Sequence, residues 1–483
     1  MATKYTVSDK KQQKKLIFCI SLGAFMGTLD IGIVNIALPM ISRDFNISIS
    51  LASKITLVYL IVTASFIPMF GKLADNKGYK KLFIGGSALF FIGSLLCAIA
   101  PGIYTLIASR ALQALGSAIT MPISFALISL YFPKKKRDEL FGKLSMWISL
   151  AFILGPVAGG LITHYLGWRM IFFINVPLGI IRKFLALEAI PADTPAVSKS
   201  PLGMRDCFLA FLFFLCLILM RDAFKADWPH YQAITIGLGI AALFSFIAFI
   251  LLQKKSSDPL INPKLFKIQA FTLGNMVSFF SVLMYSGLAF VIPFFLMEGR
   301  GYSTHAAGLL WAVAGLATFM VSPFAGWLAE RYNLQKMQIM AILLMGCAIC
   351  VYLTFNTQNT IAIFIAGTAI FGTGLGMLKP PNSAIVMNSP PADLKGEASS
   401  VFSMLNKSGY ILGIFLFEII FTLYLPHSAQ RQSHSLHHLN LPEHAFDVSW
   451  RHVIYLAIIL CAVCMIPAVL DLTARRGASE KRQ

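Results

Sequence analysis

Long apolar runs separated by short polar connections fill most of this chain, and they restrict it to a membrane-spanning fold. About fourteen such runs follow one another, from residues 16–41 and 53–72 near the start to 398–425 and 452–472 near the end. A helix of about 20 apolar residues crosses the hydrocarbon core of a bilayer with all its backbone groups paired internally. Only 13% of the residues are charged, about half the share found in soluble proteins. The sequence therefore predicts an all-α membrane protein with fourteen transmembrane helices and excludes a sizeable soluble domain.

The formal net charge is +19, and its distribution predicts the orientation in the membrane. Lysines and arginines gather in the connections around 72–81, 134–137 and 254–267 and in the tail at 475–482. Cytoplasmic connections of membrane proteins collect such residues. We therefore expect both termini in the cytoplasm, and the basic excess gives no reason to expect nucleic acid as a partner.

A short pattern occurs twice, which indicates an internal repeat. The first copy contains Gly71, Asp75 and Gly78 after the second run, and the second copy ends in Glu330 and Arg331 after the tenth. Both copies read Gly-x-Leu-Ala-acid. This spacing fits two six-helix halves with two helices inserted between them, a known transporter plan.

The predicted domains follow from that plan. They are an N-terminal six-helix bundle at 1–190, two inserted helices with flanking loops at 191–268, a C-terminal six-helix bundle at 269–474 and a cytoplasmic tail at 475–483. An external, histidine-rich loop is expected at 426–450. Its histidines have no specific ligand spacing, so we expect no metal site.

Among the charged residues within apolar runs, where a charge is costly and usually functional, Asp30, Arg110 and Glu418 are the candidates for proton coupling. Asp30 lies ~22 Å above Lys15 and Arg110 ~10 Å below the outer end of its run, at 1.5 Å per residue, so the two can meet. We hypothesise that Arg110 tunes proton exchange at Asp30; a fixed structural ion pair is the alternative. Glu418 could bind a cationic compound or a second proton, or pair with Lys379 or Lys407.

Further motifs follow in a fixed order, and they carry a family resemblance. They are Leu29-Asp30 with Asn35 and Pro39, the Gly71–Lys81 loop, Arg110 with Gln113, Gly155-Pro156 with Gly159-Gly160, and Trp168-Arg169 with Asn175 and Pro177. In this order they resemble the motifs of the major facilitator superfamily, specifically its fourteen-span drug:proton antiporter branch (QacA/EmrB type).

The resemblance implies a major facilitator fold and proton-coupled export of small hydrophobic or cationic compounds. It implies that Gly71, Asp75, Gly78, Glu330 and Arg331 act as a conformational latch. The Gly155–Gly160 motif goes with antiport, with plain helix packing as the alternative reading. The positions Asn35, Pro39, Gln113, Trp168, Arg169, Asn175 and Pro177 are taken as structural family positions.

Other functions stay open at this point. They are export of one metabolite or siderophore, uptake by proton symport, and a non-transporting receptor or scaffold. The chain lacks a GxxxxGK[ST] loop and any Ser-His or HExxH pattern, so we expect neither ATP-driven transport, nor an enzyme, nor a cofactor. The expected location is the bacterial inner membrane, with protons, a small-molecule substrate and the lipid bilayer as partners and a periplasmic adaptor protein as a candidate.

Overall fold

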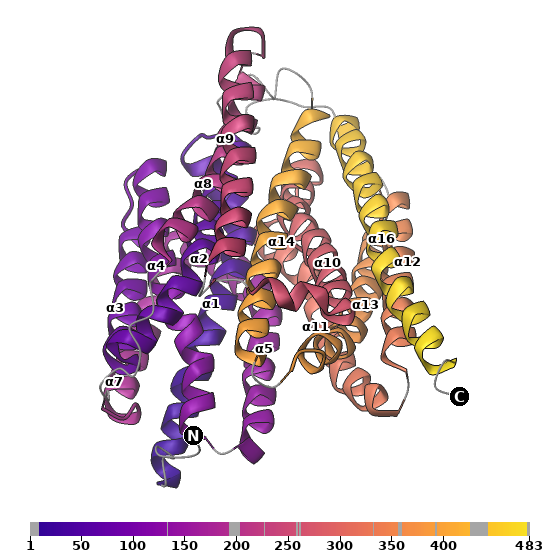
Figure 1. The fold of residues 1–483 in the computed structure, drawn as a ribbon. Helices are drawn as coiled ribbons and strands as arrows, with labels where there is room; N and C mark the ends of the chain where they lie inside the picture. Colours follow the sequence, from indigo (N-terminus) through magenta and orange to yellow (C-terminus); the bar gives the residue numbers. More distant parts are fainter. Residues whose placement is uncertain are drawn as a thin grey trace. The chain divides into compact units, whose positions relative to one another are not determined.

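The computed structural model describes residues 9–132, 134–192, 203–226, 228–256, 259, 262–331, 333–355, 360–391, 394–425 and 443–480. Within these ranges every regular element is a helix and none is a strand (Figure 1). The all-α class predicted from the apolar runs is therefore confirmed.

The described residues divide into two compact units. The first takes in the chain up to residue 37 and residues 54–260, and the second takes in residues 38–53 and those from 261 onward. The C-terminal end of α1 and the first turn of α2 thus belong to the second unit. From Lys10 to Lys255 the helices are α1 (Lys10–Asp44), α2 (Ile49–Lys77), α3 (Tyr79–Ala98), α4 (Ile103–Tyr131), α5 (Lys134–Leu166), α6 (Arg169–Phe173), α7 (Asn175–Ala189), α8 (Met204–Ala226) and α9 (Trp228–Lys255).

The second unit contains the remaining helices. They are the 3₁₀ turn η1 (Pro263–Lys267), α10 (Gln269–Phe294), the π-helical turn η2 (Phe295–Gly299), α11 (Thr304–Arg331), α12 (Leu334–Thr354), α13 (Ile361–Asn388), α14 (Lys395–Leu423) and α16 (Glu443–Glu480). In this unit α13 packs against both α11 and α12, and α10 packs against α14 and α16.

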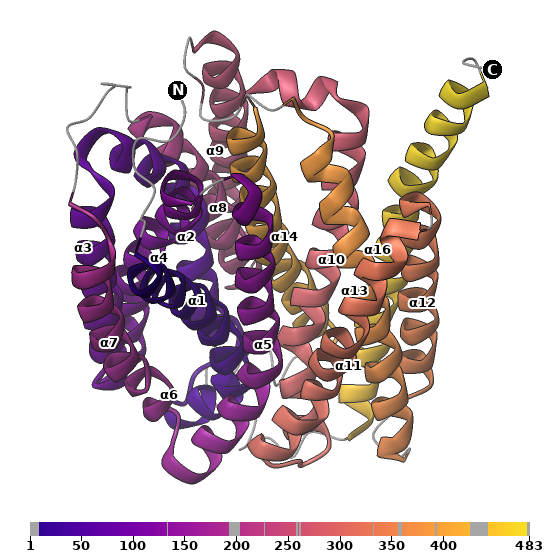
Figure 2. The ribbon, with the colours of Figure 1, turned by 90° about the horizontal axis from the view of Figure 1, so that it is seen from below.

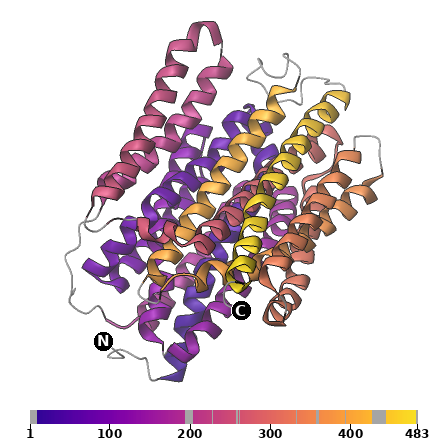
Figure 3. The same ribbon diagram turned by 45° about the vertical axis from the view of Figure 1, so that its right-hand side comes forward.

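Thirteen segments of the described chain are long and apolar enough to cross a membrane. One of these segments combines α6 and α7, over Arg169–Ala189. The remaining predicted span, 206–221, lies in α8, which packs along α9 (Figure 3). This pair lies within 191–268, where the sequence predicts two inserted helices, and its being an insertion between two halves stays a prediction.

The sixth predicted span, 168–190, is broken into α6 and α7 at Ile174. Proline has no backbone N–H, so Pro177 cannot donate to the carbonyl of Phe173, four residues earlier. The break places Asn175 at the first residue of α7 with its side chain buried. In the same unit α3 packs against both α4 and α7 (Figure 2).

Glycines set the close approach of several helices. A Cβ atom on Gly93 of α3 would lie 2.5 Å from the backbone nitrogen of Gln113 in α4, and one on Gly116 would lie 2.4 Å from the backbone nitrogen of Phe90. In the second unit a Cβ atom on Gly372 would lie 2.2 Å from the carbonyl oxygen of Ala314. Small residues of this kind let membrane helices pack backbone to backbone. The α3–α4 contact fixes the height at which α4 presents its polar side chains.

Candidate functional site

A fully buried ion pair joins α1 to α4 in the first unit. Arg110 Nη1 donates to Asp30 Oδ2 at 2.6 Å, and neither side chain has any exposed surface. Removing two charges from water costs several kcal/mol per ion, which the pair recovers only with good geometry and further hydrogen bonds. The structure thus brings together the two charges that depth along the helices had placed at a similar level.

Gln113 connects both members of this pair. It lies one helical turn after Arg110, so the two side chains project from the same face of α4. Arg110 Nη1 donates to Gln113 Oε1 at 2.7 Å, and Gln113 Nε2 donates to Asp30 Oδ1 at 3.0 Å. The same amide nitrogen lies 3.2 Å from Ser94 Oγ of α3. Gln113 therefore holds the carboxylate and the guanidinium in one geometry.

Asn175 brings α7 into the same network. Its Nδ2 atom donates to Asp30 Oδ1 at 3.1 Å and to Ser94 Oγ at 3.3 Å. Ser94 Oγ in turn donates to the carbonyl oxygen of Phe172 at 2.8 Å. Asp30 therefore receives hydrogen bonds from Arg110, Gln113 and Asn175. Sequence reasoning took Gln113 and Asn175 as structural positions and missed that both reach this carboxylate.

Aromatic rings enclose the guanidinium of Arg110. Its Cζ atom lies 4.4 Å from the ring centroid of Tyr59 and 5.5 Å from that of Phe172. Arg110 Nε donates to the carbonyl oxygen of Ile55 at 3.3 Å, whereas Nη2 has no hydrogen-bond partner in the described part of the chain. The Tyr59 hydroxyl donates to Ser117 Oγ at 3.0 Å. Cation–π contacts replace part of the lost hydration here, and one donor of Arg110 is left unused.

The Gly155–Gly160 motif of α5 packs on α1 beside this network. A Cβ atom on Gly155 would lie 3.2 Å from the Cα atom of Gly32, two residues after Asp30. One on Gly159 would lie 2.9 Å from the Cα atom and from the carbonyl oxygen of Ile33. Pro156, within α5, removes one helix hydrogen bond next to this contact. Gly160 is buried.

Only part of the predicted latch can be described. Gly78 has φ 98°, in the region that favours glycine, and it lies between α2 and α3. Gly71 lies within α2, where a Cβ atom would meet the Pro122 side chain at 3.7 Å. The side chains of Asp75, Glu330 and Arg331 lie outside the described residues, so their predicted role stays a prediction. Of the external loop predicted at 426–450, residues 426–442 lie outside the described residues, whereas 443–450 are not loop but the first turns of α16.

Several of the predicted structural positions have local partners. Thr56 Oγ1 donates to Asn35 Oδ1 at 3.1 Å, which links α2 to α1. Pro39 lies inside α1. At the start of α6, the Cζ atom of Arg169 lies 4.3 Å from the ring centroid of Trp168. The Thr56–Asn35 bond therefore holds α1 to α2, whereas the Trp168–Arg169 contact is local to the start of α6.

Glu418 is fully buried near the end of α14 in the second unit. Thr422 Oγ1 donates to the carbonyl oxygen of Glu418 at 2.8 Å and lies 3.5 Å from its Oε1 atom. Lys407, on the same helix, lies eleven residues away, or about 16 Å at the α-helical rise. The alternative in which these two side chains pair directly is therefore excluded by their spacing along α14.

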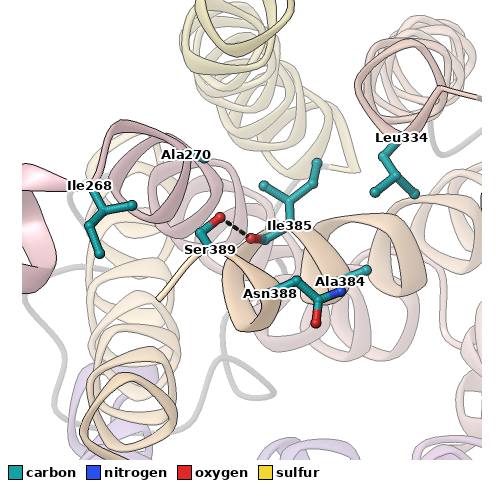
Figure 4. Close-up of a pocket in the computed structure, with 7 residues that line it drawn as sticks. All are labelled: Ile268, Ala270, Leu334, Ala384, Ile385, Asn388 and Ser389. Carbon is teal, nitrogen blue, oxygen red and sulfur yellow. Dashed lines mark hydrogen bonds between the residues drawn. The ribbon is translucent and has the colours of Figure 1, made fainter. Parts of the chain in front are cut away.

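A cavity of about 350 Å³ opens where α10 and α12 begin and α13 ends (Figure 4). Its lining consists of Ile268, Ala270, Leu334, Ala384, Ile385, Asn388 and Ser389. None of these side chains is charged, and none belongs to the predicted site. Among the described residues no group of three or more His, Cys, Asp or Glu side chains could hold a metal ion.

Comparisons with known proteins agree on the kind of molecule. The family model described as Major Facilitator Superfamily matches residues 20–414. The riboflavin transporter RibZ of Clostridioides difficile (strain 630) is 30% identical over 430 residues, which cover 88% of this chain and 92% of that protein. The multidrug export protein EmrB of Haemophilus influenzae is 28% identical over 433 residues, which cover 89% and 82%.

Solved structures show the same fold at low identity. A crystal structure of a POT family transporter in complex with a thioalcohol-conjugated peptide superposes with a TM-score of 0.66 at 16% sequence identity. The match covers 95% of this chain and 96% of that one. At this identity the likeness concerns the fold alone.

Proposed function

Because this chain belongs to the major facilitator superfamily, in its drug-efflux branch, we propose that it is a proton-coupled exporter of small hydrophobic or cationic compounds. Transport would proceed by alternating access, with the halves 1–190 and 269–474 rocking about the substrate and 191–268 inserted between them. The multidrug relatives support export of varied compounds. The observation that carries the coupling is the network around Asp30.

Protonation of Asp30 is the step that couples the proton to the movement. The charged carboxylate ties α1 to α4 and α7 through Arg110, Gln113 and Asn175. A proton on Asp30 removes the ion pair and weakens each charge-assisted hydrogen bond. The interactions that hold α1 to α4 and α7 then weaken. The glycine contact between α1 and α5 allows α1 and α5 to shift against each other. Loss of the proton from Asp30 restores the ion pair and the hydrogen bonds.

The direction of transport and the location complete the proposal. Export is favoured by the Gly155–Gly160 motif, which goes with antiport in the family that the chain resembles. The basic connections support cytoplasmic termini in a bacterial cell, with the helices in the inner membrane. A periplasmic adaptor protein is a candidate partner. Protons entering from outside would then drive the compound outward.

A second candidate is export of a single metabolite. It is favoured by one observation, the 30% identity to a protein named as a riboflavin transporter. A site for one compound and a site for many differ in breadth, which transport assays measure directly. Uptake by proton symport differs from both in the direction of movement.

The test is accumulation of fluorescent dyes and of riboflavin in energised inverted membrane vesicles, with and without a protonophore. The proposal predicts that several dyes accumulate in the vesicles. The protonophore should abolish this accumulation, and vesicles with Asp30→Asn should not show it. The matched control is Glu188→Gln, which removes an exposed acid that pairs with Lys15 at the surface and costs little. Accumulation that persists with the protonophore overturns proton coupling, and riboflavin accumulation without any dye supports the second candidate.

A further inference from the structure

Helix α14 has a polar stripe along one face. Positions three, four, seven or eight residues apart share a helix face. Ser403, Lys407, Tyr410 and Glu418 lie on this face and are called the stripe below, and Ile414 interrupts them between Tyr410 and Glu418. The opposite face carries Leu405, Leu412, Leu416 and Ile419. In a bilayer the apolar face suits lipid, whereas ionisable side chains face the protein interior or a water-filled path. The stripe therefore marks the side of α14 turned away from lipid.

Lys407 is the accessible charge on this stripe. It is half-buried, while Glu418 has no exposed surface. Lys407 forms no hydrogen bond or ion pair within the part of the chain that the structure describes. It lies twelve residues into α14, about 18 Å from the start of the helix. A cation at this depth in the membrane is costly without a counter-charge. We therefore expect the site to accept an anion that binds during transport and is then released.

A cluster of aromatic rings begins one helical turn from Lys407 in the same unit. Tyr410 follows Lys407 by one turn of α14, and its ring lies 6.2 Å from that of Tyr285 in α10, edge to face at 81°. Tyr285 stacks on Trp311 of α11 at 5.9 Å and 30°. Both tyrosines are half-buried, whereas Trp311 is buried. Three helices thus contribute rings to one cluster, and its α14 member is one turn from the amine.

We propose that Lys407, Tyr410 and Tyr285 bind the transported compound, and that its preferred class is a planar aromatic molecule with an acidic group. The amine pairs with the acid, and the tyrosine rings contact the planar part. This inference rests on the proposed function, since it assigns a substrate class to that transporter. Among the hydrophobic compounds of that proposal it favours those that carry an acid, because Lys407 is the charged side chain one helical turn from the Tyr410 ring.

Two dyes that share a xanthene ring system but differ in charge test the proposal. Fluorescein carries a carboxylate, and rhodamine 6G is a cation. Binding of each to the purified full chain in detergent is measured by fluorescence anisotropy, without any gradient. We expect Lys407→Gln to weaken fluorescein binding at least about tenfold, as for loss of a hydrogen bond to a charged group. Lys407→Arg, which keeps the charge, should stay within about threefold.

The controls separate charge from folding. Lys336→Gln removes an exposed lysine at the start of α12 and should leave the affinity for fluorescein unchanged. Lys407→Gln should not weaken binding of rhodamine 6G. Tyr410→Leu should weaken both dyes, because it removes a ring that either xanthene contacts. Monodispersity on size-exclusion chromatography verifies that each variant is folded.

The outcomes distinguish this inference from the proposed function. Equal fluorescein affinity in Lys407→Gln and the unchanged protein overturns the inference, as does tighter binding of rhodamine 6G than of fluorescein by the unchanged protein. Either result leaves proton-driven dye export in vesicles untouched. Fluorescein binding that depends on Lys407, combined with vesicles that export no dye, supports the binding site and overturns the exporter.

Discussion

Gly159 of α5 lies against Ile33 of α1 so closely that a Cβ atom on the glycine would come within 2.9 Å of the isoleucine Cα atom. The contact lies about one helical turn from Asp30, the residue to which we assign proton coupling. Any side chain at position 159 must therefore push α5 away from the part of α1 that carries the carboxylate.

We expect Gly159→Ala to destabilise the protein by about 1–3 kcal/mol, the usual cost of overpacking, and to slow dye export. Gly85→Ala is the matched control, because a Cβ atom on Gly85 of α3 would meet nothing within 4 Å. Unfolding of the purified proteins in detergent and dye export from vesicles measure the two effects. Equal behaviour of the two variants would show that the α1–α5 contact tolerates a methyl group.

Asp30→Asn should abolish protonophore-sensitive transport and also destabilise the protein. The change leaves Arg110 buried without its counter-ion, and breaking a buried pair in this way costs about 3–5 kcal/mol. Adding Arg110→Gln to Asp30→Asn removes the uncompensated charge, so the double variant should unfold at a higher temperature than Asp30→Asn alone. Thermal unfolding tests the pairing, and vesicle transport should be absent from both variants. Proton-driven transport by the double variant would rule out a coupling role for Asp30.

Gln113→Leu should destabilise the protein and weaken dye export. The amide of Gln113 donates to the Asp30 carboxylate and accepts from Arg110, and a leucine side chain can do neither. Leaving buried polar groups without a hydrogen-bond partner costs about 1–3 kcal/mol. Unfolding of the purified protein in detergent and protonophore-sensitive dye export from vesicles measure the two effects.

The control for this loss is Ser87→Ala in α3, whose buried hydroxyl donates to the Phe83 carbonyl of its own helix. Its stability and its dye export should be close to those of the unchanged protein. Asn175→Leu removes another donor to the Asp30 carboxylate and should change stability and export in the same direction as Gln113→Leu. A Gln113→Leu variant that is as stable and as active as Ser87→Ala contradicts the assigned role of these amides.

The sequence predicts more of the fold than of the candidate site around Asp30. Apolar run length predicts the helices, since a bilayer allows few other structures. The rise per residue predicts that Asp30 and Arg110 reach a similar depth, and the structure places them in contact. The depth of a residue along its helix does not show toward which neighbouring helix its side chain points. The sequence therefore could not show that Gln113 and Asn175 reach Asp30, because their directions depend on the glycine contacts of α3 with α4 and on the break before α7.

Local backbone changes were harder to predict than spans. The sequence assigns Pro177 to a family motif, whereas in the structure it accompanies the break at Ile174 between α6 and α7. The π-helical turn η2 continues α10 without any marked change in composition. Such turns depend on tertiary packing, here against Phe446 of α16, which lies 3.1 Å from where a Cβ atom of Gly299 would be.

The turn η2 also carries Glu298, which forms an ion pair with Arg43 at the end of α1. Arg43 Nε lies 2.8 Å from Glu298 Oε1, with 28% and 8% of the two side chains exposed. This pair is partly buried, so it should exceed the 0.2–1 kcal/mol typical of exposed pairs. We expect a double-mutant cycle of Arg43→Gln and Glu298→Gln to give a coupling energy of about 1 kcal/mol or more. Stability is measured by unfolding in detergent.

The exposed pair of Lys15 with Glu188 provides the comparison cycle. Its coupling energy should be smaller than that of Arg43 with Glu298. It should also fall further in high salt, because exposed charges are screened more strongly. Additive effects of the two single substitutions would show that this contact does not hold the end of α1 to η2.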